Sequence, residues 1–142
     1  MRYMLLLKGD PPADNQPSEE IIEAMTKFNE DMHRAGVLLA AEGLMPSAAG
    51  SRVVARDGKR SVVDGPFTES KELIAGFMLI QVRSHEEAIE WAKRCPVDVA
   101  AGPGVEAVVE VRRVAEIEEL TEITDEQMAV NRQIQDEIPG MR

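Results

Sequence analysis

One order of elements is predicted twice in this chain: an apolar strand, an amphipathic helix and a second apolar strand. The first unit has strands at residues 2–8 and 37–45 around a helix that starts after Ser18. The second has strands at residues 73–82 and 105–111 around a helix that starts after Ser84. The connections inside each unit are short, so neighbouring elements should lie side by side.

Local signals set the ends of these helices and place a hairpin between the two units. Ser18 can cap the first helix, and Gly36 supplies the left-handed residue that ends it. Ser84 begins a capping box for the second helix. Asp57-Gly58 lies between two short β-branched runs and is typical of a two-residue hairpin, because both turn positions need positive φ. The order βαβ, hairpin, βαβ predicts a ferredoxin-like α+β domain over residues 1–115.

Residues 116–142 form an acidic tail outside this pattern. They carry eight Asp and Glu and two Lys and Arg, a net charge of -6, whereas residues 1–115 carry a net charge of -4. Thr124 with Gln127 predicts a capping box. The helix that it begins would present a narrow apolar stripe of Val130, Ile134 and Ile138 or Met141. Such a helix has too little apolar surface to stand alone, so we expect it to dock on its own domain or on a second subunit.

Composition argues against several classes of partner. The formal net charge of -10 and the aromatic content of 4% do not fit a basic or base-stacking surface for direct nucleic-acid binding. No stretch reaches the roughly 20 apolar residues of a membrane span, and the apolar run at residues 3–7 is too short for a signal-peptide core. The single Cys95 excludes an intrachain disulfide. We therefore expect a soluble, unprocessed and cytoplasmic protein.

The turn Asp64-Gly65-Pro66-Phe67 has two interpretations that stay open. In the structural one, the Asp side chain bonds nearby backbone, Gly accepts positive φ, Pro fixes the next φ and Phe supplies a buried anchor. In the functional one, the turn aims Asp64 into a pocket, where its carboxylate orients a substrate or abstracts a proton.

Three further charged residues are candidates for ligand binding. The segment after the turn is expected to be extended, which would project Glu69 and Lys71 to one side, where they could bracket an anionic or polar ligand. The alternative is a solvated edge that discourages strand aggregation. Glu42 is the one charge in the apolar run 37–45, and such a charge usually faces a pocket, a partner or solvent.

Metal and cofactor sites are not predicted. The spacings of zinc ligands, a phosphate loop and a dinucleotide fingerprint do not occur. His85 follows the Ser84 cap and is interpreted as an incidental surface residue. His33 lies late in the first helix, where a positive charge complements the helix dipole. Cys95 is expected to pack in the core rather than to act as a nucleophile.

Several motifs together resemble the DGPF-type branch of the YCII-related proteins, a bacterial family of mostly unassigned function. They are Tyr3-Met4-Leu5-Leu6, Gly36-Val37-Leu38, Glu42-Gly43-Leu44, Asp64-Gly65-Pro66-Phe67, Glu90-Trp91-Ala92 and Val109-Glu110-Val111-Arg112. The resemblance implies a ferredoxin-like domain that pairs into a dimeric α/β barrel, with a pocket within or beside the paired sheets. It also implies that some relatives are enzymes with a His-Asp pair, and that DGPF-type members associate with alternative sigma factors.

One expected feature of the family is missing here. Its members commonly carry a His just before the last strand, whereas residues 99–105 contain none. A His-Asp mechanism would therefore need His33 to act with Asp64. Whether the chain is an enzyme stays open.

These observations lead to two hypotheses of different classes. The first is a homodimeric domain that binds a small molecule, or acts on it weakly, in a polar pocket of Asp64, Glu42, Glu69 and Lys71. The alternative is a regulatory module that contacts a sigma factor. A homodimer is also expected because two helices cover only one face of a four-stranded sheet.

Overall fold

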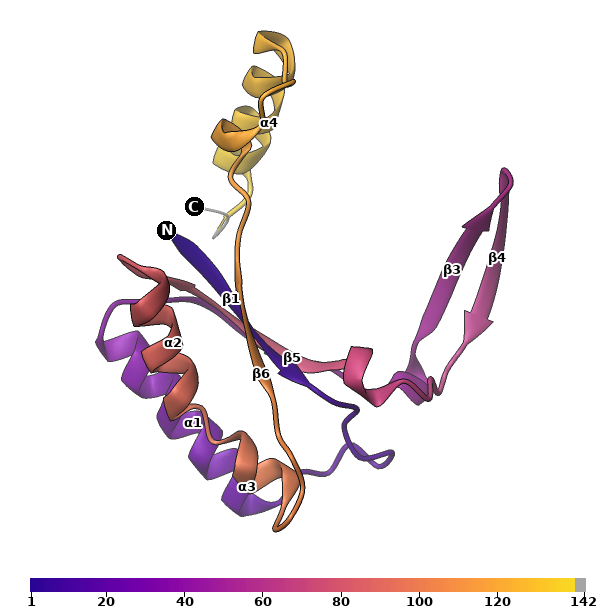
Figure 1. The fold of residues 1–142 in the computed structure, drawn as a ribbon, viewed down its shortest axis with the longest axis vertical. Coiled ribbons are helices and arrows are strands. Elements are labelled where there is room, and N and C mark those ends of the chain that lie inside the picture. The colour runs from indigo at the N-terminus through magenta and orange to yellow at the C-terminus, as the bar shows by residue number, and fades with distance from the viewer. Residues whose placement is uncertain (140–142) are drawn as a thin grey trace.

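The computed structural model describes residues 1–139, which form a four-stranded sheet, a separate two-stranded ribbon and four α-helices (Figure 1). The elements in chain order are β1 Arg2–Lys8, α1 Glu19–Arg34, β2 Leu38–Gly43, β3 Ser51–Arg56, β4 Lys59–Asp64, β5 Ile74–Gln81, α2 His85–Arg94, α3 Val97–Ala101, β6 Val109–Arg113 and α4 Asp125–Glu137. Three short 3-10 helices are η1 Ser47–Ala49, η2 Ser70–Glu72 and η3 Ile117–Glu119.

The main sheet has the strand order β2-β5-β1-β6, and every neighbouring pair is antiparallel. The two central strands, β1 and β5, come from different halves of the chain. Leu5 of β1 lies opposite Met78 of β5 on one side and Val111 of β6 on the other. The expected α+β class is confirmed, and the arrangement is compatible with a ferredoxin-like fold.

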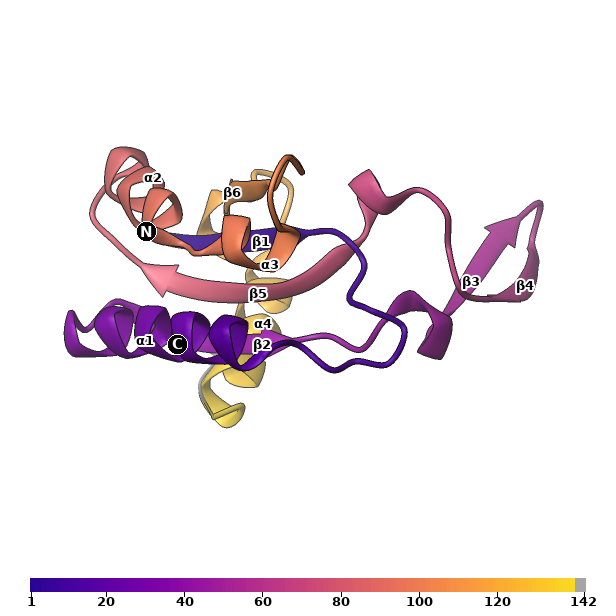
Figure 2. The ribbon, with the colours of Figure 1, turned by 90° about the horizontal axis from the view of Figure 1, so that it is seen from below.

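The predicted caps explain where α1 and α2 begin. The Ser18 hydroxyl accepts a hydrogen bond from the backbone N–H of Ile21 at 3.3 Å, and the Ser84 hydroxyl accepts one from Glu87 at 3.1 Å. Gly36, with φ of 76°, follows the end of α1 as expected. Both helices lie on one face of the main sheet (Figures 1 and 2).

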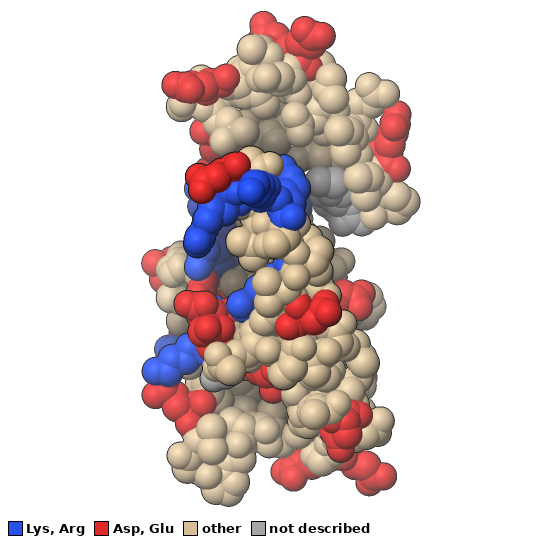
Figure 3. Space-filling model, turned by 90° about the vertical axis from the view of Figure 1, so that its right-hand side faces the viewer, with Lys and Arg blue, Asp and Glu red and all other residues tan. Residues whose placement is uncertain are grey.

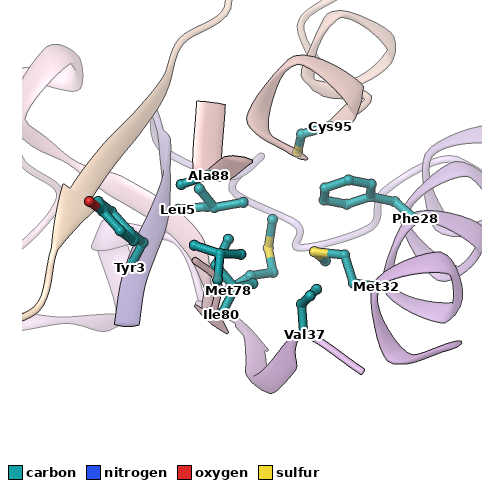
Figure 4. Packing of buried hydrophobic residues seen from close by; sticks show 10 residues of the cluster. Tyr3, Leu5, Phe28, Met32, Val37, Met78, Ile80, Ala88 and Cys95 are labelled. Carbon is teal, nitrogen blue, oxygen red and sulfur yellow. The ribbon is translucent and has the colours of Figure 1, made fainter. Parts of the chain in front are cut away.

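The core fills the space between this helix layer and the sheet (Figure 4). Its buried members are Tyr3, Leu5, Phe28, Met32, Val37, Met78, Ile80, Val82, Ala88 and Cys95. Alternation along β1 and β5 sends Leu5 and Met78 to the helices and leaves Leu6 and Phe77 on the other face. Each fully buried Leu, Ile or Met contributes roughly 1.5–3 kcal/mol relative to an exposed one.

The predicted hairpin is confirmed and stands apart from the main sheet. Asp57 and Gly58 have φ of 52° and 77°, which suits a two-residue turn between β3 and β4. Every residue of both strands is exposed. The ribbon projects beyond one end of the main sheet (Figures 1 and 2).

Three stretches differ from the sequence-based expectation. The last strand starts at Val109 rather than at residue 105, because its pairing with β1 begins at Leu7 opposite Val109 and β1 ends at Lys8. The segment after the Asp-Gly-Pro-Phe turn is not extended, since residues 70–72 form η2. The helix α3 was not expected from the sequence.

The acidic tail contains the predicted helix. Thr124 and Gln127 form both hydrogen bonds of the capping box at the start of α4. Met141, named above for the apolar stripe, lies outside the described residues. Among residues 1–139, no helix combines the length and hydropathy that crossing a membrane would require.

Candidate functional site

The sheet face opposite α1 and α2, called the open face here, has an apolar centre. It is formed by Met4 and Leu6 of β1 and by Phe77 and Leu79 of β5, all of them half-buried. Leu6 lies directly opposite Phe77, and Met4 lies opposite Leu79. Such cross-strand neighbours form a continuous apolar patch on one face of a sheet.

Charged side chains flank this patch on both outer strands. Glu42 of β2 lies opposite Phe77 and is exposed. Glu110 of β6 lies opposite Leu6 and forms ion pairs with Arg112 and with Lys8, the latter at 3.9 Å. Sequence reasoning missed Glu110, although the signal that singled out Glu42, a charge in an apolar strand, applies to it equally.

The Asp-Gly-Pro-Phe turn closes the base of the hairpin. The Asp64 carboxylate accepts a hydrogen bond from the Ser51 hydroxyl at 2.8 Å, and the backbone N–H of Gly65 donates to Gly50 at 2.9 Å. The backbone N–H of Phe67 then donates to the Ser47 hydroxyl oxygen at 3.1 Å. The Gly65–Pro66 peptide bond is cis.

Gly65 does not have the positive φ expected from the sequence, and close packing instead explains why a glycine occupies this position. A Cβ atom there would lie 1.8 Å from the backbone oxygen of Ser47 and 2.7 Å from its carbonyl carbon. Real Cβ atoms do not approach backbone atoms this closely. The turn therefore rests directly on η1.

Ser47 also connects the turn to the loop after β1. Its backbone N–H and its hydroxyl donate to the two carboxylate oxygens of Asp10 at 2.7 and 2.5 Å. These hydrogen bonds, first from the hydroxyl and then from the backbone, lower the pKa of Asp10. Sequence reasoning found neither residue, because the contact joins positions 37 residues apart and leaves no local pattern.

Arg52 of β3 joins the same assembly. Its guanidinium carbon lies 3.8 Å from the centre of the Phe67 ring, and its Nη1 lies 3.7 Å from Oε2 of Glu69. A cation over an aromatic face in a partly exposed place contributes roughly 0.5–1 kcal/mol. We call Asp10, Ser47, Arg52, Phe67 and Glu69 the turn cluster.

The predicted ligand residues beside the turn do not converge within one chain. Asp64 contacts Ser51, and Glu69 contacts Arg52. Ser51 and Arg52 are neighbours in β3, so their side chains point to opposite faces of the ribbon. Lys71 lies exposed in η2, so the expectation that it shares one side of an extended segment with Glu69 is wrong.

His33 and Asp64 lie near opposite ends of β2. His33 is exposed in the last turn of α1, just before β2 begins, whereas the turn packs against η1, which follows the end of that strand. The six residues of β2 span roughly 20 Å. A single chain therefore does not bring His33 and Asp64 together as a His-Asp pair.

Within residues 1–139, no three or more His, Cys, Asp and Glu side chains are grouped so that they could hold a metal ion. Two shallow concavities lie elsewhere: one between η3 and α4, lined by Leu120 and Asn131, and one between α2 and β6, lined by Cys95 and Val109. None of the predicted site residues lines either of them.

Comparison with known proteins places this sequence in a family. The family model described as the YCII-related domain matches residues 1–118. The chain is similar to the uncharacterized protein R00369 of Rhizobium meliloti (strain 1021), with 31% identity over 97 residues, which cover 66% of this chain and 78% of that protein. The chain belongs to the YCII-related domain family.

Proposed function

We propose that this protein is a homodimeric domain that binds a small molecule between the open faces of two copies, at the end nearest the Asp-Gly-Pro-Phe turn. The supporting observation is the open face itself, where an apolar centre of Leu6 and Phe77 lies between Glu42 on one outer strand and Glu110 on the other. Ligand sites combine an apolar lining with a few polar groups that fix orientation.

The exposed area of the single chain supports pairing. A compact monomer of 15.7 kDa exposes roughly 7,300 Å². This chain exposes 10155 Å². The excess is large enough to supply an obligate dimer interface, which buries roughly 2,000–5,000 Å² over both partners.

The chemistry of the open face indicates the class of ligand. Met4, Leu6, Phe77 and Leu79 would hold an apolar group, while Glu42 would accept hydrogen bonds at one edge. Arg112 is exposed at the opposite edge and would attract an anionic group. We therefore propose a ligand with an apolar body and one or more charged ends.

A thermal-shift screen tests the proposal. The probes are small carboxylates and amines that carry an apolar group, and at least one should raise the unfolding temperature. Glu42→Gln or Arg112→Gln should reduce that increase, whereas Glu86→Gln, an exposed change on α2, should not. A panel without any stabilising compound, or equal increases in all three variants, would contradict the proposal.

Three finer expectations stay predictions: the DGPF-type assignment, a base role for Asp64 in proton abstraction, and regulation through a sigma factor. The first is supported by residues 64–67. For the second, Asp64 is exposed and already bonded to Ser51, which favours a role in closing the hairpin. For the third, the surface available is the exposed apolar side of α4.

A further inference from the structure

The hairpin of β3 and β4 has an apolar face that none of residues 1–139 covers. Val53 and Val62 lie directly opposite each other and are 65% and 67% exposed. Ala55 and Arg60 form the next pair on that same face. A two-stranded ribbon with no further packing is marginally stable in water, so this hairpin needs a partner surface.

The two faces of the ribbon are not equivalent. Arg52, on the face opposite Val53, contacts Phe67 and Glu69 of the turn cluster. That face is thus held toward the protein's own turn at Arg52, and its Val54 and Val63 are 40% and 47% exposed. The face with Val53, Val62 and Arg60 is the more exposed of the two. We call it the hairpin docking face.

The helix α4 carries a second uncovered apolar surface. Val130, Ile134 and Ile138 recur at four-residue spacing on one side and are 51%, 44% and 46% exposed. No described residue of α4 is buried. This stripe is narrow and suits a narrow apolar partner such as the hairpin docking face.

The start of the tail is fixed, so α4 is held in place rather than trailing freely. Arg2 donates two hydrogen bonds of 2.8 Å to the Glu116 carboxylate. Arg113 donates two of 2.6 Å to Glu119. These pairs join the segment before α4 to β1 and to β6 of the main sheet. The helix α4 then extends on the side of the sheet away from α1 and α2 (Figures 1 and 2).

The segments that carry these two surfaces have opposite net charge, and the charged residues on the hairpin docking face itself are Arg60 and Asp64. Residues 51–64 carry four Lys and Arg and two Asp, a net charge of +2, whereas residues 116–142 have a net charge of -6. Lys and Arg side chains gather over the hairpin and Asp and Glu side chains lie over α4 (Figure 3). Glu126 lies one turn before Val130, where it can meet a basic side chain beside the stripe.

We propose that the hairpin docking face of one copy binds the α4 stripe of a second copy, and that the second copy returns the same contact. The proposal rests on the homodimer argued above and assigns a specific interface to it. Within one chain the hairpin and α4 lie apart, and both lie on the open-face side of the sheet (Figure 1). Two open faces could pack about a twofold axis so that the hairpin end of one sheet lies against the α4 end of the other. Each hairpin would then meet the partner's α4.

Disulfide trapping between two differently tagged full-length chains tests this contact. One chain carries Val62→Cys and the other carries Ile134→Cys, and the two are co-expressed and oxidised. We expect a disulfide-linked species that contains both tags. The matched control pairs Ile134→Cys with Ile22→Cys, an exposed position on α1, and should give roughly tenfold less product, because only contact raises the local thiol concentration. Cys95 can stay in place, since it is 5% exposed.

Charge reversal gives an independent measurement. Arg60→Glu should weaken dimerisation by about tenfold at low salt, and adding Glu126→Arg should restore it. Sedimentation equilibrium measures the dimer affinity. The rescue distinguishes a direct contact from general loss of stability, which the second change would not repair.

The possible outcomes distinguish a failure of this interface from a failure of the homodimer. A protein that sediments as a dimer but gives no more mixed-tag product than the Ile22→Cys control would overturn the hairpin contact alone. A disulfide formed only within one chain, in a Val62→Cys/Ile134→Cys double variant, would also overturn it. A monomer in sedimentation would overturn both the contact and the dimer.

Discussion

At the scale of single residues, the Asp-Gly-Pro-Phe turn is held by a few specific contacts. Ser47 supplies one hydroxyl that accepts from Phe67 and donates to Asp10, and Gly65 packs against the Ser47 backbone. These contacts connect three loops at one end of the main sheet. The turn therefore fixes how the hairpin leaves the domain.

Gly65→Ala should lower the free energy of unfolding by about 1–3 kcal/mol, because the added methyl group overlaps backbone atoms that cannot move aside. Urea denaturation measures the change. Gly43→Ala is the matched control, since a Cβ atom there meets nothing within 4 Å. Equal stability of the two variants would show that the turn does not rest on η1.

Cys95 should be unreactive in the folded protein. Burial, with a smaller effect from nearby Asp98, raises the pKa of its thiol to about 12, and only the thiolate reacts rapidly. A colorimetric thiol reagent at mildly alkaline pH should label the urea-unfolded chain quickly and the native chain slowly. Equal rates would mean that the end of α2 opens readily.

Individual residues of the turn could be predicted only in part. Asp64 and Gly65 form a recognisable turn dipeptide, so the sequence indicates a turn there. Ser47 and Asp10 are ordinary loop residues, and their contact depends on the fold bringing distant segments together. The extended course expected for Glu69 and Lys71 was wrong because a 3-10 helix forms there instead.

At the scale of elements, local capping and turn chemistry predicted most of the helices and the hairpin. The predicted caps are confirmed: Ser18, Ser84 and Thr124 each cap the helix that follows them. The last strand was placed too early, because alternation from Val105 onward resembles a strand even though that segment is a loop. The alternation of apolar and polar residues does not show whether a neighbouring strand lies close enough to pair.

The attachment of the tail to β1 should depend on pH. Hydrogen bonds from Arg2 hold the pKa of Glu116 below its usual value of 4.5. A lowered pKa in the folded state contributes stability that is present above pH 4.5 and is lost as the pH falls through the folded-state value. Glu116→Gln should therefore be less stable than the native protein near neutral pH, by roughly 0.5–1 kcal/mol for a solvent-screened pair.

The same two proteins should become equally stable in acid. The difference in unfolding free energy, measured by urea denaturation at several pH values, should shrink below about pH 4.5. A difference that stays constant across that range would show that Glu116 contributes by something other than its charge.

At the scale of the whole molecule, one face of the sheet is packed and the other is open. The helix layer covers Leu5 and Met78, whereas Leu6 and Phe77 face outward between charged edges. The sequence indicated this asymmetry, since it predicts only two long helices for the four-stranded sheet. It could not reveal that the hairpin and α4 both lie on the open side, because that depends on the three-dimensional course of two exposed segments.

Sedimentation equilibrium of the native protein and of Leu6→Asp tests pairing of the open faces most directly. The native protein should sediment at micromolar concentration as a dimer, with twice the chain mass of 15.7 kDa. Leu6→Asp places a charge in the apolar centre and should sediment as a monomer with an unchanged circular dichroism spectrum, whereas Ile22→Asp on the exposed side of α1 should remain a dimer. A native protein that sediments as a 15.7 kDa monomer, or a Leu6→Asp variant that dimerises as tightly as the native chain, would contradict the account.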